Sequence, residues 1–124
     1  TTLLVGATTY TAKGGLGGVG MIPGTSTIPV LGGASGGAST NGDANGAGTP
    51  GGWALRILGT VAISGAGASS SWGGGGNARD TGGAGNAATG YGSGGGGGCV
   101  ENNSGAVVGG DGSAGVLLVH EYSA

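Results

Sequence analysis

Residues Gly82–Gly98 read GGAGNAATGYGSGGGGG, a run that is mostly glycine and in which only Tyr91 has a large side chain. Four more tracts of the same kind occur in the chain, which has 38 glycines in 124 residues. These tracts are Gly14–Gly20, Gly32–Asn45, Gly65–Gly76 and Gly109–Gly115. None of the tracts has an apolar period of 3.6 residues, so the sequence predicts essentially no α-helix.

Two physical states fit such tracts. One is a flexible linker, the usual behaviour of Gly-rich sequence. The other is an extended, left-handed, polyproline-II-like chain packed side by side, because backbones without Cβ atoms can approach closely and exchange hydrogen bonds. We expect the packed state over Gly82–Gly98. Valine at Gly95 or Gly96 should then prevent folding, whereas a linker would tolerate it.

Most large side chains gather in three short regions outside the tracts. Leu3–Thr11 and Trp53–Ser64 are rich in β-branched and aromatic residues, and Val116–Tyr122 reads VLLVHEY. Such composition is typical of strands. The sequence therefore predicts a mainly β and irregular fold, with a few short strands in these regions, long extended glycine-rich segments and almost no helix. We expect the three regions to form a small core.

The composition excludes several classes of protein. Leu, Ile and Val together make 21 of the 124 residues, too few for an ordinary enzyme core, so backbone hydrogen bonds or burial between subunits must add stability. Only 6% of residues are charged and the net charge is −2, which argues against a nucleic-acid partner. Apolar runs are too short for a membrane-spanning helix of ~18–20 residues.

Motifs for catalysis are present only as chance matches. Gly15–Gly20 fits the dinucleotide pattern G-x-G-x-x-G, but Pro23 and Gly24 prevent the helix that the pattern requires. Gly33–Gly37 fits G-x-S-x-G, but the one histidine, His120, belongs to the last β region. Acidic residues are scattered. We therefore predict no enzyme activity, no cofactor and no metal site.

The side chains that interrupt the tracts are the candidate ligand contacts. An aromatic ring can stack on the apolar face of a sugar, while amides and charged groups meet its hydroxyls. The candidates are Trp72 with Arg79 and Asp80 as one cluster, Glu101 with Asn102 and Asn103 as a second, and Tyr91 as a weaker third choice. The alternative is that Trp72 and Tyr91 cap the small core or fill a subunit interface.

Five blocks follow one another along the chain. They are VGATTYTAKGGLGG from Val5, NGDANGAGTPGG from Asn41, SSSWGGGGN from Ser69, GYGSGGGGG from Gly90 and GDGSAGVLLVHEY from Gly110. In this order they resemble the glycine-rich C-terminal domain of bacteriophage tail fibre proteins, over essentially the whole chain. Each block is unspecific by itself, and it is their order that carries the resemblance.

The resemblance implies a single glycine-rich domain over residues 1–124, expected to be the C-terminal fragment of a longer fibre protein. It implies a homotrimeric fibre tip at the distal end of the tail fibre in the virion. Such a tip would bind a bacterial surface receptor (lipopolysaccharide, an outer-membrane protein or a pilus) without inserting into the membrane. The variable segments would be Met21–Leu31, Ser69–Asp80 and Cys99–Val108. The alternative is a structural cap or spacer that binds no receptor.

Overall fold

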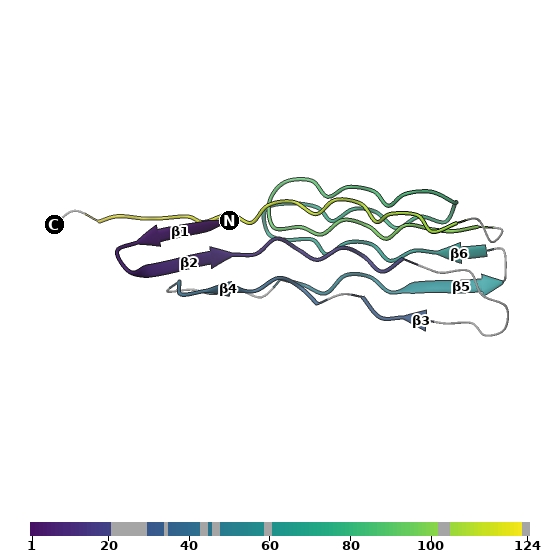
Figure 1. Ribbon diagram of the computed structural model, residues 1–124, viewed down its shortest axis with the longest axis horizontal. Coiled ribbons are helices and arrows are strands. Elements are labelled where there is room, and N and C mark those ends of the chain that lie inside the picture. Colours follow the sequence, from purple (N-terminus) through teal and green to yellow (C-terminus); the bar gives the residue numbers. More distant parts are fainter. Residues whose placement is uncertain are drawn as a thin grey trace.

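The computed structural model describes residues 1–20, 30–33, 35–42, 45, 48–58, 61–101 and 105–122, and is elongated (Figure 1). The described residues contain no helix, and their strands are short. The strands are β1 (Thr2–Val5), β2 (Thr8–Ala12), β3 (Val30–Leu31), β4 (Ser39–Thr40), β5 (Ala54–Leu58) and β6 (Val61–Ile63). The prediction of a mainly β and irregular fold without α-helix is confirmed.

The strands form two small antiparallel sheets, ordered β1-β2-β4 and β3-β5-β6, which lie toward opposite ends of the molecule (Figure 1). The predicted region Leu3–Thr11 is the β1–β2 hairpin, in which Gly6 takes a left-handed φ of 59° that favours glycine. Trp53–Ser64 contains the β5–β6 hairpin, with a register shift between Arg56 and Leu58. Both of these β predictions are confirmed.

The third predicted strand, Val116–Tyr122, is wrong. These residues run as an extended chain toward the C-terminal end of the molecule in Figure 1 and belong to no strand. Val116 and Leu117 are half-buried, whereas Leu118, Val119 and Tyr122 are open to solvent, with Val119 62% exposed. A β-prone sequence becomes a strand only when an edge accepts its ladder of hydrogen bonds, and the described residues form no such ladder here.

From the end of β2 the glycine tracts run lengthwise and side by side, and several of them lie alongside β5 and β6 (Figure 1). We call this region the glycine bundle; its segments are 13–20, 48–53, 64–70, 73–79, 83–89, 93–99 and 107–115. Hydrogen bonds between its neighbouring segments recur at every third residue. The N–H groups of Ser64, Gly67 and Ser70 donate to the carbonyl oxygens of Arg79, Gly76 and Gly73, in that order.

A period of three is that of the left-handed polyproline-II helix, which has three residues per turn, whereas side chains and faces of a β-strand alternate with a period of two. The tracts therefore adopt the packed, hydrogen-bonded state rather than the linker state, as expected for Gly82–Gly98. Each segment presents backbone groups in several directions around its axis, so it can bond to several neighbours at once.

The core of the molecule is the segment 93–99, whose residues are all buried. Its backbone exchanges hydrogen bonds with the segments 13–20, 64–70, 73–79, 83–89 and 107–115. The expected core of large side chains is wrong: Leu4 is 67% exposed, and the buried apolar residues are mostly small. They are Ala12, Ala54, Ala62, Ala68, Cys99 and Val100. Backbone packing replaces side-chain packing because close approach leaves no room for side chains.

The geometry at individual glycines shows how little room there is. A Cβ atom at Gly95 would overlap the carbonyl oxygen of Gly110, and one at Gly96 would overlap that of Asn77. At Gly17, by contrast, the nearest neighbouring atom would lie 3.9 Å away, an ordinary van der Waals contact. Glycine is therefore required by packing at the centre of the glycine bundle and is dispensable for packing at parts of its edge.

Candidate ligand-binding cleft

The two ends of the glycine bundle carry different side chains. The turns 70–73 and 89–92 lie together at one end, the aromatic end, where Trp72 and Tyr91 face each other across an antiparallel bridge. The turn 79–83 and the residues 99–101 lie at the other, the charged end, joined by the bridge between Gly83 and Cys99. This end also contains Arg79, Asp80 and Glu101.

The predicted cluster of Trp72 with Arg79 and Asp80 is therefore wrong. The extended segment 73–79 separates Trp72 from Arg79, and seven residues at about 3.1 Å each place them roughly 20 Å apart along the bundle. Residues close in the sequence are far apart because the tract does not fold back within its length. Trp72 instead lies beside Tyr91, which the sequence offered only as a weaker third candidate contact. Arg79 and Glu101 lie at the same end of the bundle, near Cys99.

The backbone of the aromatic end is held by a small network of hydrogen bonds. The Tyr91 N–H donates to the Trp72 carbonyl oxygen (3.1 Å). The Ser70 hydroxyl accepts from the Trp72 N–H (3.0 Å) and donates to the Tyr91 carbonyl oxygen. Gly90 and Gly92 take left-handed φ values of 76° and 71°, which tighten the second turn. Backbone and hydroxyl groups thus fix these turns, and none of these hydrogen bonds involves the aromatic rings.

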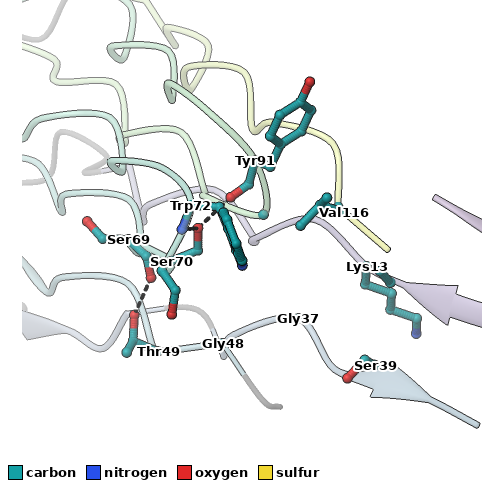
Figure 2. A pocket seen from close by; sticks show the side chains of 14 residues that line it. Lys13, Gly37, Ser39, Gly48, Thr49, Ser69, Ser70, Trp72, Tyr91 and Val116 are labelled. Carbon is teal, nitrogen blue, oxygen red and sulfur yellow. Dashed lines mark hydrogen bonds between the residues drawn. The ribbon is translucent and has the colours of Figure 1, made fainter. Parts of the chain in front are cut away.

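Both rings are largely open to solvent, Trp72 at 60% and Tyr91 at 55% exposure. The alternative that they cap the core of this chain is therefore wrong, whereas burial of the rings in an interface between subunits stays a prediction. In Figure 2 the Trp72 ring reaches into a cleft, while the Tyr91 phenol points away from it. The two aromatics are adjacent through their backbones but present their rings in different directions.

The cleft has a volume of about 580 Å³ and lies between the aromatic end of the bundle and the strands β2 and β4 (Figure 2). Hydroxyl groups on its lining come from Ser39, Thr49, Ser69, Ser70 and Ser71. Lys13, at the end of β2, and Val116 complete the side facing Trp72 (Figure 2). The Thr49 hydroxyl donates to the Ser69 carbonyl oxygen (2.8 Å), which ties the two walls together.

Sequence reasoning missed the contribution of Lys13 and Thr49, and it included Ser70 only as part of the variable segment Ser69–Asp80. They come from three distant parts of the chain, and only the packing of the bundle against β2 and β4 brings them together. A weak signal was available for Lys13, since it is the one lysine of the chain and directly precedes a glycine tract. No comparable signal marks Thr49 among the many hydroxyl residues of the sequence, whereas Ser70 belongs to the stretch SSSW that ends at Trp72.

At the charged end, Arg79 supports the turn that follows it. Its N–H donates to the Ser64 hydroxyl (2.9 Å), and its guanidinium Nη1 donates to the Ala84 carbonyl oxygen (2.9 Å). The guanidinium also lies against Gly83, whose φ of 146° favours glycine. Arg79 therefore connects the segments 73–79 and 83–89 by hydrogen bonding and stabilises their packing. Asp80, the next residue, is exposed.

Cys99 lies fully buried at the base of the charged end, where its Sγ contacts the Ala62 carbonyl oxygen (3.2 Å). Burial raises the pKa of this thiol, and the nearby charges of Glu101 and Asp80 raise it further, while Arg79 acts in the opposite direction. A protonated, inaccessible thiol is a packing group rather than a nucleophile. The predicted contacts Asn102 and Asn103 lie outside the described residues, as do positions 21–29 of the segment Met21–Leu31.

Two further features are absent from the described ranges. No three His, Cys, Asp or Glu side chains come together there in a way that could hold a metal ion. The same part of the chain contains no helix with the length and apolarity needed to cross a membrane.

Comparisons with known proteins add no relative: no family model matches the chain, and neither curated proteins nor solved structures match it significantly.

Proposed function

We propose that this chain is the receptor-binding tip domain of a bacteriophage tail fibre, a non-enzymatic adhesin that attaches the virion to the bacterial surface. The order of the glycine-rich blocks supports the assignment to a fibre. The receptor would be lipopolysaccharide, an outer-membrane protein or a pilus, and the domain would stand at the distal end of the fibre.

The observation that carries the binding role is the exposed Trp72 ring on a rigid turn. Its backbone is fixed on both sides by the Ser70 hydroxyl and by Tyr91, yet 60% of its surface faces solvent beside a cleft. A large aromatic group on a pre-organised backbone loses little conformational entropy on binding, which is why such residues dominate binding energies.

A homotrimer fits this proposal. Exposed apolar residues gather on β1 and on the tail that follows the bundle, including Leu4, Val5, Leu118 and Val119. Neighbouring copies would cover such residues in a symmetric assembly. Three weak sites on one tip would also gain avidity of about 10²–10⁴-fold over a single site.

The second candidate function is a structural cap or spacer for a fibre. The observation that favours it is the glycine bundle itself, whose buried segment 93–99 is complete within one chain and stiffens the domain without any ligand. A cap needs no exposed aromatic ring, so the two functions differ in what they require of Trp72.

The test is binding of the fluorescently labelled domain to a panel of whole bacteria, with competition against adsorption of the phage that carries the fibre. We expect saturable binding to at least one strain. Trp72→Ala should weaken it about thirtyfold per site, the effect of losing a hot-spot residue of about 2 kcal/mol. Trp53→Ala is the matched control, because Trp53 is equally exposed (59%) but does not line the cleft.

Two results would overturn the receptor-binding role. If the domain binds no strain and does not slow adsorption at saturation, the cap function is correct. If Trp53→Ala weakens binding as much as Trp72→Ala does, the site has been placed at the wrong aromatic residue.

A further inference from the structure

We propose that the cleft beside Trp72 binds a negatively charged saccharide, with a sugar ring stacked on the indole and the anionic group held by Lys13. This deepens the proposed function, on which its biological meaning rests, by naming the chemistry of the ligand. The anionic group is a carboxylate or a phosphate on the sugar, since either would bind an ammonium group.

The shape of the cleft suits a small saccharide. Its volume of about 580 Å³ lies within the range of roughly 300–1,000 Å³ found for ligand sites. The Trp72 ring extends into it rather than lying flat on the bundle (Figure 2). One broad apolar ring among polar groups matches a sugar, which has apolar C–H faces and a polar rim.

The polar groups of the lining match the rim of such a ligand. Hydroxyls can both donate and accept hydrogen bonds, as sugar hydroxyls do. The Thr49 and Ser69 hydroxyls each make one hydrogen bond within the chain. Thr49 donates to the Ser69 carbonyl oxygen, and the Ser69 hydroxyl accepts from the Gly75 N–H (3.1 Å). The Thr49 oxygen can still accept a hydrogen bond and the Ser69 hydroxyl can still donate one. The Ser71 hydroxyl also lines the cleft.

Charge decides between a neutral and an anionic saccharide. Lys13 is the only charged residue among the described residues that line the cleft, and its side chain is exposed. Asp80 and Glu101 lie at the charged end, across the length of the bundle. An ammonium group without a neighbouring carboxylate on the lining favours an anion, and a charge-assisted hydrogen bond is roughly twice as strong as a neutral one.

The test is an NMR titration of the purified full chain, followed at the indole N–H of Trp72. Three trisaccharide probes of equal ring number are compared: one neutral, one containing uronic acid and one carrying a phosphate monoester. We expect both anionic probes to bind at least about tenfold more tightly than the neutral one, with an affinity that falls as salt increases. The tighter of the two anionic probes identifies the source of the charge.

Variants separate the two halves of the proposal. Lys13→Gln should bring all three probes to the same affinity, while Trp72→Ala should abolish binding of all three and Trp53→Ala should leave it unchanged. Because Trp72→Ala has no indole signal at this position, binding to that variant is followed at the backbone amides of Lys13 and Thr49, which line the same cleft. Unchanged melting temperatures will show that the variants are folded, since Lys13 and both tryptophans are exposed.

Each failure has its own signature. Equal binding of the neutral and anionic probes by the unmodified chain would overturn the role of Lys13. No shift of the Trp72 signal with any probe at millimolar concentration would overturn the saccharide site, while binding to whole cells would then still support the receptor-binding function through another ligand. Probe binding without binding to any bacterium would have the opposite meaning: the site would stand and the proposed function would fail.

Discussion

The glycine bundle and the β1–β2 hairpin stand in contrast in how they use side chains. The hairpin carries large apolar residues, yet Leu4 and Val5 remain mostly exposed. The segment 93–99 has almost no side chains, yet all of it is buried and hydrogen-bonded to five neighbouring segments. In this protein the backbone builds the core. The large side chains are therefore available for the surface, where ligands and other subunits can meet them.

The largest loss of stability is expected when one carbon atom is added at the centre of the bundle, where the backbone forms the core. Gly95→Ala should destabilise the fold by about 3 kcal/mol or more, at the upper end of overpacking effects, because the new Cβ would overlap backbone rather than a movable side chain. Thermal unfolding followed by circular dichroism measures the loss. Gly17→Ala is the matched control and should cost far less, since its Cβ would have space. Equal melting temperatures for the two variants would contradict a close-packed backbone core.

An intermediate effect is expected where a side chain does support the bundle. Arg79→Ala removes the hydrogen bond to the Ala84 carbonyl oxygen and should cost about 1 kcal/mol, the usual net worth of such a bond. Asp80→Ala, at the exposed neighbouring position, should change the unfolding free energy by no more than about 0.5 kcal/mol. Chemical denaturation gives both values. A larger loss of unfolding free energy for Asp80→Ala than for Arg79→Ala would show that Arg79 does not stabilise the packing of these two segments.

The smallest expected effect is a pH dependence at the buried thiol. The pKa of Cys99 is raised in the folded state, so above about pH 8.5 the unfolded chain loses a proton that the folded chain retains. Stability should therefore fall as the pH rises from about 8.5 toward 10, and should be unaffected by this group below pH 8. Cys99→Ala should show a shallower fall over the same interval. If the unfolding free energy falls equally steeply with pH in the unmodified chain and in Cys99→Ala, the thiol does not cause the pH dependence.

The sequence predicted the parts of the fold that local composition controls. Leu3–Thr11 and Trp53–Ser64 each contain two antiparallel strands because their residues are β-prone, and the absence of helix from the described residues follows from the missing 3.6-residue period. Val116–Tyr122 failed because pairing depends on a distant edge. The role of the glycine core was only partly predictable, since composition indicates that backbones can approach but not which segment lies at the centre.

The candidate site was less predictable than the fold. Trp72 and Tyr91 were recognised as interruptions of the tracts, but their pairing depends on the lengths of the segments between turns. Lys13 and Thr49 reach the same cleft from elsewhere in the chain. A sequence in which hydroxyl residues are common gives no means of choosing those that packing will bring together.

Amide hydrogen exchange tests the backbone core most directly. The N–H groups of Gly94, Gly96 and Gly97 donate to the carbonyl oxygens of segments 64–70 and 83–89. They should exchange only through global unfolding and be the slowest amides of the chain, slower than the exposed amides of residues 118–122 by several orders of magnitude. Exchange of the same three glycines at the rate of an unstructured peptide would contradict the account, because it would mean that the tract is a linker.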